Sequence, residues 1–145
     1  MRVVHILPSR PFGGLQRLAV QLAHTQLRRG LDVRILGLYD DSYLQEAARA
    51  RELHYVSTPG VRPSFPAARM LSRLLQEYRP VLVHLHGGLL WANATLAILK
   101  YWPIVVHIHE YSGGLGRVRN QLANRLQALT GDRFIAVSRS VAADW

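Results

Sequence analysis

Short apolar runs rich in β-branched residues alternate with helical patterns along the whole chain, and this alternation constrains the fold more than any other feature. Most of the runs are apolar on both faces, which is typical of parallel strands covered by helices on both sides. We predict strands over Arg2–Leu7, Asp32–Leu38, Leu53–Ser57, Val81–Leu85, Ile104–His109 and Arg133–Val137. Because βαβ units cross over with a right hand, the sequence predicts an α/β fold, a Rossmann-like three-layer sandwich with a mainly parallel sheet.

The segments between these runs keep the spacing of helices that bury one face. The first is expected to end at Gly30, since glycine readily takes the left-handed C-terminal conformation. Its predicted inward residues are Leu15, Leu18, Ala19, Leu22, Ala23 and Leu27. Further helices are predicted over Tyr43–Arg51, Pro66–Tyr78, Leu89–Tyr101 and Leu115–Leu129. The nearly apolar segment Leu89–Tyr101 should be covered on most sides.

The bulk composition narrows the class of protein. At 145 residues and 49% apolar content, the chain is expected to form a single domain over residues 1–145. It has no cysteine, which excludes disulfides, thiolate metal sites and cysteine nucleophiles. No apolar run reaches the roughly 20 residues of a membrane-spanning helix, and no signal peptide is evident, so a cytoplasmic location is expected.

The charge balance favours an anionic partner. There are 18 basic and 9 acidic residues, a formal net charge of +9. Such an excess suits a membrane surface, a phosphorylated ligand or nucleic acid. Nucleic acid is the least favoured of the three, because the basic residues are scattered along the chain instead of forming a patch interleaved with aromatic residues.

Two glycines follow the first predicted strand, at the edge where doubly wound sheets bind ligands. Gly13 and Gly14 would let backbone N–H groups approach a phosphate at the start of a helix, or they would simply form the turn. The glycine fingerprint of dinucleotide-binding proteins and the P-loop are both absent from the sequence. Binding of NAD or of ATP through a Walker motif is therefore disfavoured.

Two His-x-His sequences end the fourth and fifth predicted strands. We expect His84 and His86 to point to opposite faces, with His84 in the core and His86, followed by Gly87, reaching the ligand cleft. His109 could act as a general base or hydrogen-bond donor, with Glu110 orienting it or binding a hydroxyl; the alternative for both is a structural hydrogen bond. Because histidines on opposite faces supply a zinc site poorly, no metal is expected.

Five segments in order resemble the N-terminal domain of retaining glycosyltransferases of family 4, which have the GT-B fold of two facing Rossmann-like domains. They are Gly13–Arg17, Leu22-Ala23 with Arg29–Val33, Pro80–Gly87, Val106–Glu110 and Asp132–Ser140. The resemblance covers essentially the whole chain. Gln16, Leu31 and Val81 depart from the family pattern, which usually has Glu, His and Asp there.

The resemblance implies transfer of a sugar from a nucleotide-sugar donor to an acceptor hydroxyl with retention, in surface polysaccharide or glycolipid biosynthesis, without a cofactor or metal. It also implies that the family's C-terminal nucleotide-binding domain is absent from this chain, so that this fragment alone would be inactive. The implied roles are donor phosphate binding by Gly13 and Gly14, catalysis by His109 with Glu110, and acceptor-side contacts by His86 and Gly87.

Such enzymes often act on lipid-linked acceptors, so docking on the inner face of an anionic membrane is a further expectation. Arg117, Arg119 and Arg125, on the outer face of the helix predicted over Leu115–Leu129, are its candidates, although a solvated basic face explains them equally. Two other classes stay open: a non-catalytic α/β binding module or partner subunit completed by another chain, and a Rossmann oxidoreductase, which the missing glycine fingerprint disfavours.

Overall fold

The computed structural model describes residues 1–7, 13–58, 65–87, 90–99, 101–108, 125 and 128–139. Its centre is a sheet in which all the strand pairs are parallel, in the order β3-β2-β1-β4-β5-β6. The strands are β1 (Arg2–Leu7), β2 (Asp32–Gly37), β3 (His54–Ser57), β4 (Leu82–His86), β5 (Ile104–Ile108) and β6 (Arg133–Ala136). The predicted Rossmann-like α/β fold is confirmed.

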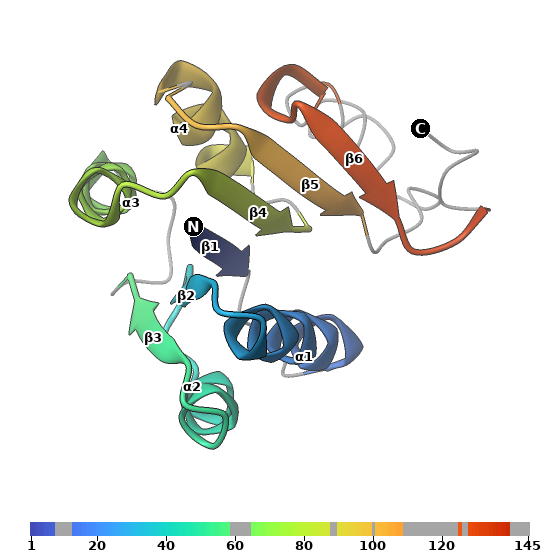
Figure 1. Ribbon diagram of the computed structural model, residues 1–145. Helices are drawn as coiled ribbons and strands as arrows, with labels where there is room; N and C mark the ends of the chain where they lie inside the picture. Colours follow the sequence, from blue (N-terminus) through green and yellow to red (C-terminus); the bar gives the residue numbers. More distant parts are fainter. Residues whose placement is uncertain are drawn as a thin grey trace.

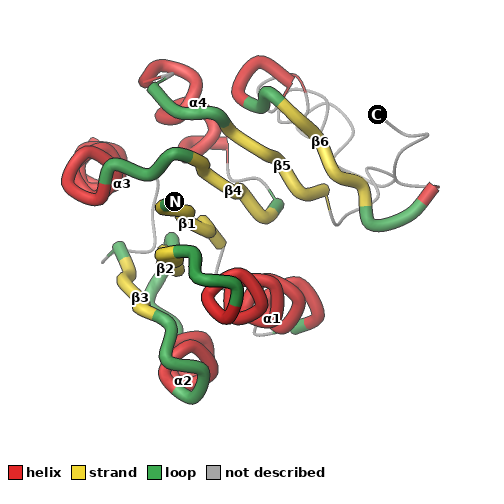
Figure 2. The backbone as a smooth tube through the Cα atoms, viewed as in Figure 1, coloured by secondary structure: helices red, strands yellow, loops and turns green. Residues whose placement is uncertain are grey.

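Helices cover both faces of this sheet. Figure 1 shows α1 (Gly14–Arg28) and α2 (Ser42–Arg49) on one face, and α3 (Phe65–Tyr78) and α4 (Leu90–Leu99) on the other. The same three layers can be followed along the chain in Figure 2, where the strands lie between the two helical layers. Among the described residues, no helix is long and apolar enough to cross a bilayer.

The six predicted strands are all present, with ends that agree or differ by one residue. The fourth lies one residue further along than predicted, so that His86 is its last residue. The predicted fifth strand is described as far as Ile108, and His109 and Glu110 lie outside the described residues. Most of the helix predicted over Leu115–Leu129 also lies outside them, Arg117 and Arg119 included. Arg125 is described and is helical and exposed.

One prediction about helix burial needs correction. In α1 the buried residues are Gln16, Ala19, Val20 and Ala23. Leu18, predicted to face inward, is 44% exposed, because the helix is rotated toward the side carrying Val20. In α4, Ala92, Asn93 and Leu96 are buried, Ile98 is 83% exposed, and the other residues from Trp91 to Leu99 are partly buried.

Helix ends follow local sequence rules. Gly30 has a φ of 82° just after α1, and its N–H donates to the Leu27 carbonyl at 2.9 Å, as predicted for a glycine at this position. The Asp41 side chain accepts a hydrogen bond of 3.1 Å from the Leu44 N–H and so caps the start of α2. Gly30 thus marks the end of α1, and Asp41 marks the start of α2.

The two faces of the sheet have separate cores. Leucines and valines of β1, β2, β4 and β5 pack with α3 and α4 in one cluster, which includes Leu71, Leu75 and Leu85. The other cluster packs β1 and β2 against α1 and α2, and includes Leu7, Val20 and Ile35. The second cluster does not extend over β4 and β5, which carry His84, His86 and His107 on that face together with Leu82 and Val105.

Candidate functional site

The centre of the sheet is a topological switch point. The chain moves from β1 to β2 and β3 on one side and then to β4, β5 and β6 on the other, so that β1 and β4 are neighbours. Helices following the two strands cover opposite faces (Figure 1). In doubly wound sheets this arrangement opens a crevice outside the carboxyl ends of these strands, where ligands bind.

Four histidines form one block on the α1 side of the sheet, beside this switch point. The parallel register pairs His5 with His84 and His86 with His107. Neighbouring side chains in register lie on the same face of a sheet. All four are buried, with 0%, 4%, 0% and 8% exposure for His5, His84, His86 and His107.

The prediction that His84 and His86 point to opposite faces is wrong. Their rings are stacked, with centroids 4.2 Å apart and planes inclined by 18°. Side chains alternate between faces from one residue to the next, so residues two apart on a strand share a face. The same rule makes His84 and His86 a pair rather than one core residue and one cleft residue.

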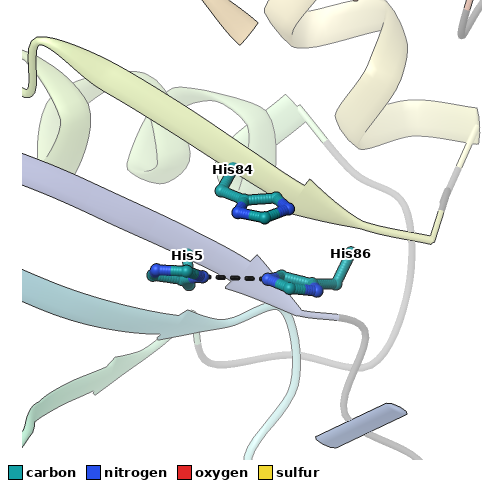
Figure 3. Close-up of side chains that lie close together, drawn as sticks. All are labelled: His5, His84 and His86. Carbon is teal, nitrogen blue, oxygen red and sulfur yellow. Dashed lines mark hydrogen bonds between the residues drawn. The ribbon is translucent and has the colours of Figure 1, made fainter. Parts of the chain in front are cut away.

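A chain of hydrogen bonds joins three elements within the block. His5 Nδ1 lies 2.9 Å from His86 Nε2, and His5 Nε2 lies 2.7 Å from Oε1 of Gln26 on α1. Figure 3 shows the His5 and His86 rings edge to edge, with His84 on one side of them. β1 and β4 supply the rings, and α1 supplies the amide that fixes the far end.

Burial keeps His5 and His107 uncharged. Loss of hydration lowers the pKa of His5 from 6.5 to about 4, an effect that the Gln26 hydrogen bond partly offsets and His107 reinforces. Burial also lowers the pKa of His107. At neutral pH both rings therefore act as neutral hydrogen-bonding groups.

Three of the rings come close enough to raise the question of a metal ion. One nitrogen from each of His5, His84 and His86 lies within 4.8 Å of the others. A metal binds an imidazole at about 2.0–2.1 Å, near the ring plane. Because His84 and His86 are stacked, their in-plane lone pairs run side by side and do not meet at one point. As arranged, the three rings form a hydrogen-bonded and stacked cluster, and using them as metal ligands would require the rings to turn.

Gly13 and Gly14 lie at the start of α1, as predicted, but they are not equivalent. The Gly13 N–H donates to Gln16 Oε1 at 2.9 Å, so Gln16 satisfies this group from within the helix. Gly14 is exposed, and a Cβ placed on it would meet no atom within 4 Å. Of the two, Gly14 leaves the open approach that a phosphate needs at a helix N-terminus.

Gly87 follows His86 at the carboxyl edge and has a φ of 67°, a conformation that favours glycine. Its N–H donates to the His107 carbonyl at 2.8 Å. The turn after β4 is thus tied to β5 beside the histidine block. The structure places His86 and Gly87 together at this edge, with His86 fully buried.

Sequence reasoning missed His5, His107 and Gln26 as members of the cluster. The shared face of His84 and His86 could have been read from their spacing. The pairing of His5 with His84 depends on which strands are neighbours and in which register, and neither appears in the local pattern. Gln26 was not singled out, because a glutamine on a helix gives no local signal of a partner on the sheet.

The sheet order, with its switch point between β1 and β4, defines a Rossmann-like α/β domain. The chain belongs to glycosyltransferase family 4, since the sequence profile of Glycosyltransferase Family 4 matches residues 12–145. Its fold is that of the N-terminal domain of a GT-B protein. No curated protein matches the sequence.

Solved structures share this fold at low sequence identity. The Anabaena protein HepE, solved in complex with UDP-glucose, has a TM-score of 0.80 and 15% identity, over 99% of this chain and 39% of its own. A glycosyltransferase from Rickettsia africae has a TM-score of 0.76 and 13% sequence identity, over 98% of this chain and 38% of its own. UDP-GlcNAc 2-epimerase from Neisseria meningitidis, bound to UDP-GlcNAc, has a TM-score of 0.72 and 14% sequence identity, over 99% of this chain and 42% of its own. The chain spans about two fifths of their length.

Proposed function

We propose that this chain is the acceptor-side domain of a retaining glycosyltransferase that moves a sugar from a nucleotide-sugar donor to an acceptor hydroxyl. The observation that carries the proposal is the family match over residues 12–145, on a parallel sheet with a polar cluster at its switch point. Two of the solved structures with this fold are complexes with UDP-sugars. A nucleotide sugar is therefore the donor class to test first.

The proposed roles follow the carboxyl edge of the sheet. Gly14 offers its open side at the N-terminus of α1 to the donor diphosphate, with Gly13 completing the turn. His109 donates to the transferred sugar or the departing phosphate, with Glu110 beside it. His86 and Gly87 form the acceptor side. No metal or cofactor enters the proposed reaction, and a facing C-terminal domain would supply the nucleotide pocket.

The test is sugar-nucleotide turnover by the full-length product of the gene, with circular dichroism confirming the fold of each variant. His109→Ala is expected to lower kcat by about 10²–10⁴, the usual contribution of a positioned acid–base group. Normal turnover by this variant would remove His109 from catalysis. If no nucleotide sugar is turned over by the wild type, the non-catalytic binding module becomes the better account.

Gly14→Ala tests donor binding separately. The added methyl group meets nothing in the structure, so stability should barely change. It would stand where the diphosphate approaches the backbone, so the donor KM should rise on the order of tenfold. Gly131→Ala cannot serve as the control for a glycine replacement. Its added Cβ would clash with Val106 at 2.7 Å and so change stability as well. An unchanged donor KM would show that Gly14 only forms the turn.

A surface polysaccharide or glycolipid pathway is proposed on the basic charge of the chain, which suits docking on an anionic membrane. The candidates stay Arg117, Arg119 and Arg125, of which the described Arg125 is exposed. Co-sedimentation with vesicles of phosphatidylglycerol and phosphatidylcholine tests the idea. Replacing the three arginines by glutamine should abolish most binding, and binding that is unchanged or independent of anionic lipid would contradict it.

A further inference from the structure

The expectation that the chain binds no metal rested on His84 and His86 facing opposite ways, and they share a face of the sheet. We propose that His5, His84 and His86 bind a divalent transition-metal ion of the zinc type, which ties β1 to β4 at the switch point. The ion is structural and takes no part in the proposed sugar transfer. The inference therefore stands or falls on metal binding alone.

The spacing of the nitrogens suits such an ion. One nitrogen from each of the three rings lies within 4.8 Å of the others. Around a tetrahedral zinc ion with bonds of about 2.0–2.1 Å, the ligand nitrogens lie about 3.3–3.4 Å apart. His5 Nδ1 and His86 Nε2 face each other at 2.9 Å. They need to separate by only about half an ångström to hold the ion between them.

The third ligand requires one ring to turn. Figure 3 shows His84 on one side of the edge-to-edge pair, so an ion displaced to that side from the line between the two nitrogens lies among all three rings. The His84 ring is now stacked on His86, with planes inclined by 18°. A turn about its Cβ–Cγ bond, which is a broad torsion, aims a nitrogen at the ion. The proton between His5 and His86 passes to the second nitrogen of His86, so the rings stay neutral.

Gln26 supplies the outer support that metal-binding histidines need. Such a histidine usually donates its other ring N–H to an oxygen acceptor, which fixes the orientation of the ring. Gln26 Oε1 can only accept, and it lies 2.7 Å from His5 Nε2. The proton of neutral His5 is thus on Nε2, and its lone pair on Nδ1 points into the block.

Burial favours a structural ion over a catalytic one. The three histidines are 0%, 4% and 0% exposed, and structural zinc sites are closed to solvent. A structural site usually has four ligands. His107 of β5 offers a further imidazole, with its ring centroid 5.5 Å from those of His84 and His86.

The first test measures the metal content of the full-length product of the gene, made without a histidine tag, stripped with a chelator, incubated with zinc and desalted. We expect one tightly held zinc ion per chain. X-ray absorption should show at least three imidazole nitrogens at about 2.0–2.1 Å from it. Desalted protein without zinc, or zinc held mainly by oxygen, overturns the proposal whatever the turnover of nucleotide sugars.

A matched pair of glutamine substitutions on α1 locates the ion. Gln26→Leu removes the outer hydrogen bond to His5 and should raise the Kd for zinc about 10–100-fold. Gln21→Leu makes the same change at an exposed position of the same helix and should leave the Kd unchanged. Competition with a chromogenic chelator measures both. Equal Kd values for the two variants would show that zinc binds elsewhere.

Histidine substitutions test a ligand directly. His84→Asn removes one proposed ligand, and His54→Asn removes an exposed histidine on β3. Only His84→Asn should lose both the zinc and the rise in Tm that zinc gives to the wild type. Circular dichroism shows whether each variant folds; if His84→Asn does not, the glutamine pair and X-ray absorption decide. A folded His84→Asn that keeps its zinc would contradict the proposal.

Discussion

The two faces of the central sheet carry different kinds of side chains, although the same strands build both. On the α3–α4 face, β1, β2, β4 and β5 present an unbroken apolar core. On the α1–α2 face, the apolar core stops at β1, and histidines occupy the neighbouring positions of β4 and β5. The larger apolar cluster therefore lies on the first face. On the second face, hydrogen bonds to His86 and Gln26 satisfy both ring nitrogens of buried His5.

Leu85→Ala should lower the free energy of unfolding more than any other substitution, because it opens a cavity in the apolar core. Leu85 stands between His84 and His86 in the sequence but faces the opposite side of the sheet. Leu85 is fully buried, and truncation of such a leucine costs about 2–5 kcal/mol of unfolding free energy. Urea denaturation at neutral pH measures this cost. Leu129→Ala, at a residue 64% exposed, is the control and should change little. Equal effects at the two positions would contradict the division between the faces.

Acidification should weaken the histidine face next. The pKa of His5 is about 4 in the folded chain against 6.5 for an ordinary histidine, so the unfolded chain binds more protons between these values. Stability is therefore full above pH 6.5 and falls as the pH is lowered, by about 3 kcal/mol for this group near pH 4. Urea denaturation at a series of pH values gives the slope.

His5→Asn should reduce this slope, whereas His54→Asn, at an exposed histidine, should leave it unchanged. A slope that persists in His5→Asn would show that other groups carry the acid sensitivity, and the contrast between the faces would then lie elsewhere than at His5.

Gly87→Ala probes the edge where the histidine face ends. A φ of 67° is unfavourable for alanine, so the substitution should cost about 1–2 kcal/mol in thermal or urea unfolding. Gly30→Ala makes the same change at a φ of 82°, after α1 and away from the edge, and should cost a similar amount. If the site depends on the turn after β4, only Gly87→Ala should also impair acceptor binding.

Tyr78→Phe should have the smallest effect. Tyr78 belongs to the apolar face, and its hydroxyl donates to the Asp32 carbonyl at 2.8 Å. Removing one such bond costs about 0.5–1.5 kcal/mol. The variant should unfold at slightly lower urea and keep the wild-type dependence on pH. A change in the pH slope would mean that the two faces are coupled.

The local patterns were sufficient for the layers and most element boundaries. Six strands and the helices α1 to α4 were predicted because period-2 and period-3.6 spacing, glycine at Gly30 and proline at Pro80 act over a few residues. The burial of single residues was less certain. Leu18 was predicted to be buried and is exposed, whereas Val20, which was not predicted, is buried. A small rotation of α1 changes which side faces the sheet, and local hydrophobicity does not determine that rotation.

In the candidate site, too, some features could be predicted from local patterns and others could not. The glycines after β1 and the end of β4 were found because ligand sites of parallel sheets occur at the carboxyl ends of strands. The relation of His84 to His86 was open to prediction and was misread. The contacts of His5 with His86 and with Gln26 join residues 81 and 21 positions apart, and such contacts arise only when the strands take their order.

The sequence by itself determined the α/β class, the parallel strands and the family, because these rest on residue patterns and segment order along the chain. The tertiary structure alone decided that β1 lies against β4, that four histidines share one face, and that His5 contacts both His86 and Gln26. The physical reason is that a hydrogen-bonded cluster depends on distances between strands, and those distances are fixed by packing on both faces of the sheet at once.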